Sequence, residues 1–330
     1  MTTYKEAGVD IEAGDQAIKK ISKLVKKTFN QNTLIDIGGF GGCYEFPKDD
    51  FKNPVLVSSA DGVGTKLNLA FLQNKHDTIG QCLVNHCTND ILAIGAQPLF
   101  FLDYFAAGKL DKEVFHSVVE GLTKGCIENS CVLIGGETAE MPGFYKENEY
   151  DISGTIIGVV EKEYMMPSKK VNKDDLLYAL PSTGLHTNGY SLARNVLLKE
   201  FRIDDYIESL GKTLGEELLS IHKSYLNVTK DILKKNWLVG ISHITGGGII
   251  NNTNRILGDD QKIEVDWNVW DIPAIFNLIQ DLGNVSDEEM RKSMNLGLGI
   301  VYIIKPEGAQ EFESHMNLLN QKFYNIGIVK

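Results

Sequence analysis

Three carboxylates in the first half of the chain, Asp61, Asp90 and Glu137, have neighbours that suit the binding of a metal ion and a polyphosphate. Asp61 and Glu137 each stand where a short apolar run meets glycine, and Asp90 lies inside a helical pattern. Mg²⁺ in proteins takes one or two carboxylates together with phosphate oxygens. We therefore predict that these three carboxylates converge on Mg²⁺ and ATP. For each cluster alone, a plain turn or a solvated surface remains an alternative.

The residues beside two of these carboxylates support the same chemistry. Asp61 leads into two glycines, which let the backbone approach a phosphate closely, and into Lys66, which supplies a point charge. Asn85 and Asn89 are four residues apart and share one face of the helix that carries Asp90. That face either lines a pocket for hydrated metal and nucleotide or meets water.

Two segments in the second half combine hydroxyl groups, histidine and glycine ahead of a predicted helix. In Ser182–Ser191 (STGLHTNGYS), hydroxyls, an amide and the N–H groups of a helix start form a candidate anion site. His186 is its candidate proton-transfer group, although an ordinary helix cap with a surface histidine is the alternative. The segment His243–Gly248 (HITGGG) repeats this composition, and three glycines before a helix favour close approach of a ligand.

The composition excludes several other classes of protein. The 33 basic and 44 acidic side chains give a net charge of −11, which disfavours nucleic acid or an anionic membrane as the main partner. No apolar run approaches the roughly 20 residues of a membrane helix, and no secretory signal is evident, so we expect a cytoplasmic protein. The chain has no Walker phosphate-binding motif, and no GxGxxG follows a strand. Five cysteines without CxxC spacing predict buried, reduced thiols.

The elements that must position these residues fall into two units. A chain of 330 residues usually forms two domains. The polar segment Met166–Asp175 marks the boundary, so we predict domains over residues 1–168 and 169–330. Strands are expected over 55–60, 99–106, 131–134, 152–160, 176–180, 239–244, 298–304 and 324–329, and helices over 15–28, 77–94, 188–199, 213–235 and 307–319, with others opening at Asp111 and after Gly248. Without strict βαβ alternation, this order favours an α+β fold.

Taken together, these motifs resemble the phosphoribosylformylglycinamidine cyclo-ligase family, also called aminoimidazole ribonucleotide synthetases. The resemblance runs nearly end to end and covers Tyr4–Ile11 (YKEAGVDI), Gly38–Gly42 (GGFGG), Asp61–Lys66 (DGVGTK), Asn89-Asp90, Pro98–Tyr104 (PLFFLDY), Gly135–Gly143 (GGETAEMPG), Gly184–Ser191 and His243–Gly248. Thiamine-monophosphate kinase, selenophosphate synthetase and a hydrogenase-maturation protein share only the metal-binding part of this pattern.

The resemblance implies a fold and a reaction. The fold would be two α+β domains, with the N-terminal sheet pairing with that of a second subunit to make a barrel in a homodimer. The reaction would be ATP-dependent closure of formylglycinamidine ribonucleotide to aminoimidazole ribonucleotide, with release of ADP and phosphate. ATP phosphorylates the formyl oxygen, and the amidine nitrogen then attacks the same carbon.

The resemblance also assigns residues to each role. The metal ligands are Asp61, Asp90 and Glu137. The catalytic residues are Lys66, His186, Asn188 and His243. The ATP-binding residues are Gly38, Gly39, Gly41, Gly42, Asp61, Gly62, Gly64, Thr65, Lys66, Asn85, Asp90, Glu137 and Thr138. The substrate-binding residues are Thr187, Asn188, Ser191, Thr245, Gly246, Gly247 and Gly248.

Two other functions remain open at this point. Another ATP-using enzyme of the same superfamily, a thiamine-monophosphate kinase or a selenophosphate synthetase, shares the metal-binding pieces. The selenophosphate reaction needs a reactive cysteine near the glycine loop, for which Cys43 is the only candidate, and we interpret that residue as a packing residue. A non-catalytic nucleotide-sensing subunit is the third possibility, and it has no need for all three carboxylates together with Lys66.

Overall fold

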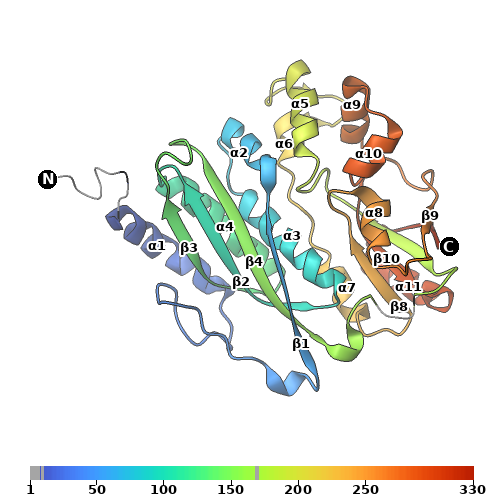
Figure 1. The fold of residues 1–330 in the computed structure, drawn as a ribbon. Helices are drawn as coiled ribbons and strands as arrows, with labels where there is room; N and C mark the ends of the chain where they lie inside the picture. Colours follow the sequence, from blue (N-terminus) through green and yellow to red (C-terminus); the bar gives the residue numbers. More distant parts are fainter. Residues whose placement is uncertain (1–7, 9–10, 168–170) are drawn as a thin grey trace.

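The computed structural model describes residues 8, 11–167 and 171–330, and shows two α+β units side by side (Figure 1). The expected α+β class is confirmed, and the barrel between subunits stays a prediction. The predicted boundary at residues 168–169 and most of the Tyr4–Ile11 motif lie outside the described residues. No helix in the described part of the chain is long and apolar enough to span a bilayer.

The first unit is a four-stranded sheet in the order β1-β4-β2-β3, in which only the β2–β3 pair is parallel. Asp111 caps α4 by accepting from the backbone N–H groups of Glu113 and Val114, as its position before the helical pattern predicts. The elements are α1 (Ile11–Val25), β1 (Pro54–Gly62), α2 (Leu67–Gln73), α3 (Ile79–Ala93), β2 (Gln97–Ala107), α4 (Lys112–Glu128), β3 (Val132–Glu140) and β4 (Tyr150–Glu161).

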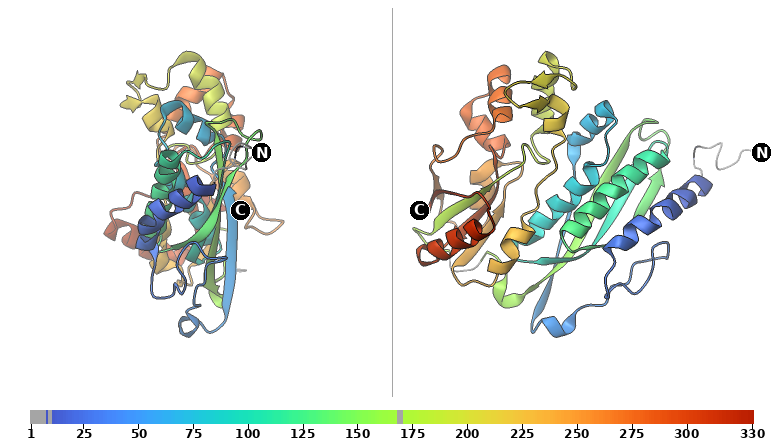
Figure 2. Two further views of the ribbon diagram at one scale, coloured as in Figure 1. Left: turned by 90° about the vertical axis from the view of Figure 1, so that its left-hand side faces the viewer. Right: turned by 180° about the vertical axis from the view of Figure 1, so that it is seen from behind.

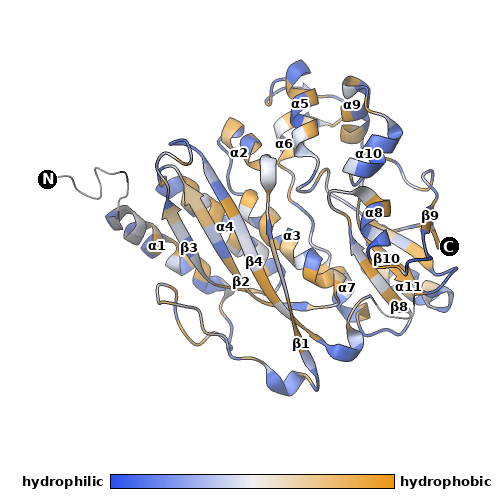
Figure 3. Ribbon diagram, viewed as in Figure 1, coloured by the Kyte–Doolittle hydropathy of each residue, from blue (hydrophilic) through white to orange (hydrophobic). Residues whose placement is uncertain are grey.

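Helices cover one face of this sheet, and no described helix covers the other. Seen from behind, α1, α3 and α4 lie across the strands (Figure 2, right), where Phe101 and Phe105 of β2 are buried. Hydrophobic residues recur along the strands (Figure 3), and those pointing away from the helices remain accessible. Leu56 is 64% exposed and Tyr104 is 40% exposed on this uncovered face.

The second unit is a five-stranded antiparallel sheet in the order β8-β10-β5-β11-β9. Every residue of β10 is buried, because α7 and α11 pack on one face and α8 on the other. The elements are β5 (Leu176–Pro181), α5 (Tyr190–Glu200), β6 (Tyr206–Ile207), β7 (Lys212–Thr213), α6 (Leu214–Leu218), α7 (Leu226–Thr229), β8 (Leu238–His243), α8 (Gly248–Asn254), β9 (Ile263–Val265), α9 (Ala274–Gly283), α10 (Asp287–Ser293), β10 (Leu298–Ile304), α11 (Ala309–Leu318) and β11 (Tyr324–Val329).

The helix expected over residues 213–235 is wrong. The structure has α6 and α7 there, separated by the non-helical segment 219–225. This segment lies against α3, and its backbone groups pair with side chains of the first unit instead of forming a helical ladder: Ser220 O accepts from Lys66, and His222 O accepts from Asn85. Tertiary contacts therefore override the helical pattern in this stretch.

The cysteine prediction needs one correction. Cys82, Cys87, Cys126 and Cys131 are buried free thiols, as expected, but Cys43 is exposed. It lies in the loop before β1, where the neighbouring Tyr44 ring packs against Phe100 with the ring centroids 5.4 Å apart. The tyrosine, and not the cysteine, makes the packing contact.

Candidate active site

Asp61 and Asp90 come together where β1 ends beside α3. Asp61 is the penultimate residue of β1, and Asp90 lies in the last turn of α3. Burial raises the pKa of Asp61 to about 7, aided by a hydrogen bond with Asp90 and by repulsion from it. Burial alone would raise the pKa of Asp90 too, but its interactions with His243, His86 and Asp61 together outweigh burial and lower it. The pair therefore holds a shared proton near neutral pH, as closely placed carboxylates do.

Hydrogen bonds hold Asp90 from both units of the chain. One carboxylate oxygen accepts from Ser59 Oγ of β1 at 3.1 Å, and the other lies 2.8 Å from His243 Nδ1 at the end of β8. His86, one helical turn before Asp90 on α3, places its Nε2 3.7 Å from Asp61 and 3.8 Å from Asp90. The contact between Asp90 and His243 of the HITGGG segment thus joins the two units at one point.

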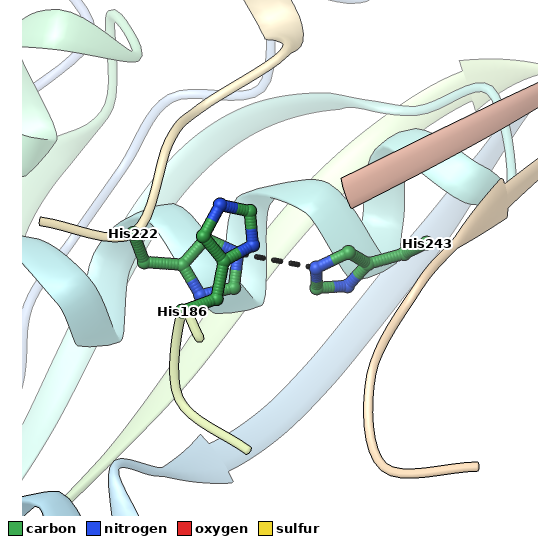
Figure 4. Close-up of side chains that lie close together, drawn as sticks. All are labelled: His186, His222 and His243. Carbon is green, nitrogen blue, oxygen red and sulfur yellow. Dashed lines mark hydrogen bonds between the residues drawn. The ribbon is translucent and has the colours of Figure 1, made fainter. Parts of the chain in front are cut away.

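Four histidines from both units surround this pair. His243 contacts His222, with their Nε2 atoms 3.1 Å apart, and His222 stacks on His186 with ring centroids 4.0 Å apart (Figure 4). Thr187 Oγ1 bridges His222 and His86. Burial lowers the pKa of His86 to about 4 and that of His186 and His222 well below the usual value. These three rings are therefore neutral at physiological pH.

His186 is held in a strained backbone conformation. Its φ of 62° lies in the left-handed region, which costs a non-glycine residue of order 1 kcal/mol or more. Its Nε2 accepts from the Thr183 N–H at 3.1 Å, and the side chain is 1% exposed. The ring thus packs inside the site and does not face open space, unlike the surface histidine that the sequence left possible.

Lys66 has a different environment from the one expected. The side chain is fully buried, and its ammonium group donates to His186 O at 2.9 Å and Ser220 O at 2.6 Å, with Cys82 Sγ at 3.3 Å. A phosphate cannot reach this group in the observed conformation. Lys66 instead ties two loops of the second unit to the turn that follows Asp61.

The asparagine face of α3 is likewise buried and does not line an open pocket. Asn85 donates to Glu128 at 3.0 Å and to His222 O at 2.8 Å. Asn89 donates to Lys223 O and accepts from the Tyr225 N–H. Neither expected reading of this face holds, because it binds the segment 219–225 instead of water or nucleotide.

The predicted substrate-binding residues lie on two neighbouring loops around this centre. Ser191 Oγ lies 3.1 Å from Thr65 Oγ1 on an exposed edge, so the two units also meet there. The Asn188 amide nitrogen is buried without a partner. A Cβ on Gly246 would meet the Asn188 carboxamide at 3.1 Å. These two loops therefore form one surface beside Asp90.

Three residues of the HITGGG segment, Thr245, Gly247 and Gly248, have structural roles. Thr245 Oγ1 donates to Asn252 of α8, which fixes the loop to the helix that follows. A Cβ on Gly248 would lie 1.9 Å from Arg291 O, and its φ is 65°. Glycine is therefore required at 248 by close backbone approach, and a ligand is not needed to explain it. Gly247, with φ 127°, turns the chain into α8.

The other predicted ATP-binding residues gather elsewhere. The loop 38–42 and β3 enclose a cavity of about 460 Å³ together with α1 and α4. Glu137 and Thr138 lie on its wall, as does Asp103 of β2, whose pKa burial raises to about 7. A cavity of this size is within the usual range for small-molecule sites.

Glu137 does not join Asp61 and Asp90 within one chain. Asp61 pairs across the sheet with Gly154 of β4, then with Asp103 and Gly136, so three strand spacings intervene. With adjacent strands about 4.8 Å apart, Glu137 lies about 14 Å from Asp61. Its side chain also points to the uncovered face, because it pairs with Tyr104, whereas Asp61 faces the helices.

The sequence alone did not identify His86, His222 or Asp103 as site residues. His86 lies one turn before Asp90, so the i, i+4 spacing was an available signal. Asp103 stands at an inward position of the strand PLFFLDY, where a carboxylate among apolar residues is unusual. His222 had no signal, because it fell inside an expected helix.

Comparisons with known proteins place this geometry in a family. A family model described as AIR synthase related protein, N-terminal domain, matches residues 48–160, and the model for the corresponding C-terminal domain matches residues 172–330. The chain is 46% identical over 326 residues to a phosphoribosylformylglycinamidine cyclo-ligase of Thermoanaerobacter sp. (strain X514), which covers 98% of this chain and 96% of that relative. The chain belongs to the phosphoribosylformylglycinamidine cyclo-ligase family.

Other members and solved structures agree with this assignment. A cyclo-ligase of Acetivibrio thermocellus is 46% identical over 330 residues, covering 100% of this chain and 97% of that relative. The fold is shared with thiamine-monophosphate kinase from Stenotrophomonas maltophilia, at a TM-score of 0.71 and 14% identity over 95% of this chain and 93% of that one. It is also shared with hydrogenase maturation protein HypE in complex with ATP, at a TM-score of 0.67 and 16% identity over 98% and 88%.

Proposed function

We propose that this cyclo-ligase family member closes formylglycinamidine ribonucleotide to aminoimidazole ribonucleotide with ATP, releasing ADP and phosphate, in purine biosynthesis. The observation that carries the proposal is the near full-length identity to relatives of that name, 46% over 98% of the chain. The site geometry is consistent with it, because an acidic pair, hydroxyl groups and buried neutral histidines meet between the two units.

Mg²⁺ and ATP fit the acidic pair. Asp61 and Asp90 share a proton because two adjacent negative charges repel each other. A divalent cation would remove this repulsion by binding both ionised carboxylates. Asp61 and Asp90 would hold Mg²⁺, which supplies neutralisation of the triphosphate charge when bound. Glu137 can reach the same ion only across a subunit contact, so its role as a third ligand depends on the dimer proposed below.

The residues of the two loops would fold and shield the substrate. The predicted substrate-binding set, Thr187, Asn188, Ser191, Thr245 and Gly246–Gly248, borders the acidic pair from the second unit. The buried, unpartnered Asn188 amide is a donor without an acceptor, which a substrate oxygen would satisfy. Holding the amidine nitrogen near the formyl carbon makes ring closure effectively unimolecular, and the buried histidines limit access of water to the activated oxygen.

We further propose a homodimer formed through the uncovered face of the first sheet. Leu56 and Tyr104 expose apolar surface there, and a broad apolar sheet face on a monomer usually marks an interface. Pairing this face with its copy buries both, as the barrel expected from the family requires. The glycine-loop cavity lies at the β3 end of the same sheet and is lined by the predicted residues Gly38, Gly39, Gly41, Gly42, Glu137 and Thr138.

A cytoplasmic location stays a prediction.

The Asp61→Asn variant tests the proposed function. We expect turnover of ATP in the presence of formylglycinamidine ribonucleotide to fall by at least about 100-fold, because the variant loses a carboxylate that would hold the Mg²⁺ ion, and that ion neutralises the charge developing on the transferring phosphoryl group. The measurements are ADP release and the diazotisation colour of the aminoimidazole product.

Asp49→Asn, at an exposed carboxylate far from the pair, is the matched control and should keep wild-type turnover. Normal ADP release by Asp61→Asn would contradict the proposal. Selenide-dependent AMP formation by the wild type would favour the selenophosphate synthetase alternative, and tight ATP binding without product would favour the sensor.

A further inference from the structure

His222 lies at the centre of the contacts between the two units. The side chain is fully buried. Its backbone N–H donates to Cys82 Sγ at 3.3 Å, and its carbonyl accepts from Asn85 at 2.8 Å. The imidazole contacts His186, Thr187 and His243, which are predicted site residues. No other residue named above contacts all three.

Asn89 determines which nitrogen of His222 carries the hydrogen. The Asn89 Oδ1 accepts from the backbone N–H of Tyr225 at 3.0 Å, so the other side-chain atom is the amide nitrogen. That nitrogen donates to Lys223 O and lies 3.1 Å from His222 Nε2. His222 Nε2 is therefore an acceptor, and the hydrogen of the neutral ring is on Nδ1. Burial, which lowers the pKa of His222, keeps the ring neutral.

We propose that His222 is a positioning residue of this active site: held in one tautomer by Asn89, it sets the hydrogen-bond direction of its neighbours. The proposal rests on the proposed function, because it supposes that the chemistry takes place beside Asp61 and Asp90.

The tautomer of His222 sets the donor and acceptor of the hydrogen bonds that run through Thr187. His222 Nδ1–H donates to Thr187 Oγ1 at 3.3 Å, so the single hydroxyl hydrogen is free to be donated to His86 Nδ1. His86 then carries its hydrogen on Nε2, the atom that faces the two carboxylates at 3.7 and 3.8 Å. On the other side, His243 turns its Nε2 toward the acceptor on His222 and its Nδ1 toward Asp90.

His186, His222 and His243 could be taken for a metal centre, since one nitrogen from each lies within 4.8 Å of the others. The ring geometry argues against this. A histidine ligand directs an in-plane lone pair at the ion, but the His186 and His222 rings are stacked at 20°, so their in-plane lone pairs run side by side (Figure 4). The Nε2 lone pair of His222 is also already shared between the Asn89 amide and His243 Nε2, each 3.1 Å away.

The test uses the full chain with His222→Ala, and His222→Asn and His222→Gln in case the alanine variant does not fold. We expect kcat for ADP release to fall about 10- to 100-fold, the range for groups that orient ligands of a site, while KM for ATP stays close to that of the wild type. His76→Gln removes another buried, hydrogen-bonded imidazole outside the site and should leave kcat unchanged.

Chemical rescue separates positioning from simple filling of space. Imidazole added to His222→Ala can both accept and donate, so it should restore turnover, whereas 1-methylimidazole has no N–H and should not. Equal rescue by both, or a kcat of His222→Ala equal to that of the wild type, would overturn the proposal.

Two measurements do not depend on turnover. Imidazole nitrogen NMR of the wild type should show His222 with Nε2 unprotonated, and in His222→Ala the His86 tautomer should become mixed. A protonated His222 Nε2, or stoichiometric zinc in the wild type that His222→Ala loses, would overturn the inference. A wild type that makes no aminoimidazole but shows the expected tautomers would contradict the proposed function and leave the tautomer assignment intact.

Discussion

At the scale of single residues, the acidic pair is the centre of the proposed chemistry. Asp61 and Asp90 are 29 positions apart in the sequence and meet because a strand end and the last turn of a helix lie side by side. Their unequal pKa values follow from unequal neighbours, since His243 forms a hydrogen bond with Asp90 and no histidine forms one with Asp61. Such perturbed pairs are typical of functional sites.

The raised pKa of Asp61 predicts how Mg²⁺ binding depends on pH. An ion that needs both carboxylates ionised must displace the proton that Asp61 holds up to about pH 7. We therefore expect apparent Mg²⁺ affinity to rise between pH 6 and 8, by up to tenfold per pH unit where one proton is released. Calorimetry in buffers of different ionisation enthalpy measures this release. An affinity independent of pH over this range would contradict the assignment.

The same group makes a prediction about stability without metal. The pKa of Asp61 rises from 3.8 to about 7 on folding, so the native state holds this proton more tightly than the unfolded state does. The resulting stability is present below pH 4 and is lost as the pH rises through about 7. Relative to Asp61→Asn, the wild type should therefore lose stability across this window in urea titrations, and parallel pH profiles for the two proteins would contradict it.

At the scale of elements, the segment 219–225 connects the two units. Its backbone pairs with side chains of α3 and with Lys66 in place of the helical ladder that residues 213–235 suggested. Because segment 219–225 has no helical hydrogen bonds of its own, its conformation depends on these partners. An unpaired buried carbonyl would cost free energy. The break in the helix is what brings His222 to the acidic pair.

Removing the Lys66 ammonium group should therefore loosen this connection. In Lys66→Met, Ser220 O loses its buried ammonium donor, and an unsatisfied carbonyl costs about 1–3 kcal/mol of the free energy of unfolding, whereas His186 O keeps the Tyr190 hydroxyl as a donor. Urea denaturation measures the loss, and faster amide exchange in residues 219–225 would locate it. Lys75→Met, at an exposed position of the same region, is the matched control. Unchanged stability with lost ATP affinity would restore the phosphate-binding role first expected for Lys66.

At the scale of the whole molecule, the two units differ in how their sheets are covered. In the part of the chain that the structure describes, the five-stranded sheet is enclosed by helices on both faces, whereas the four-stranded sheet has helices on one face alone (Figures 1 and 2). In a single chain, the uncovered face of the four-stranded sheet therefore exposes apolar side chains such as Leu56 to solvent. Glu137 points to this same face, so its proposed role as a metal ligand requires the dimer.

A charge placed on the uncovered face tests the assembly. We expect Leu56→Lys to shift the protein from dimer to monomer in light scattering coupled to gel filtration, because burying an unpaired ammonium group in an apolar interface is costly. Leu318→Lys changes a leucine that is 81% exposed on α11 of the other unit and should not affect the mass. A wild type that is monomeric at all concentrations would remove the dimer proposal.

Much of this protein follows from local sequence. The apolar strands, the Asp111 cap and the glycines that end apolar runs are short-range signals, and they predicted β10 and β11 to the residue. They did not predict β6, β7 or β9, and β3 runs six residues beyond its expected end. Asp61, Asp90 and the HITGGG histidine were identified from residue type and neighbours, and the resemblance over nearly the whole length named the family.

Only the tertiary structure decided which of these residues meet and in what protonation state. The burial of Lys66, the break at 219–225 and the fixed tautomer of His222 come from contacts between residues more than 100 positions apart. Local propensity carries no information about such contacts, because a buried polar group takes its partner from whatever the fold brings beside it. The distance of Glu137 from Asp61 has the same origin, since strand order in a sheet is set by packing and not by position along the chain.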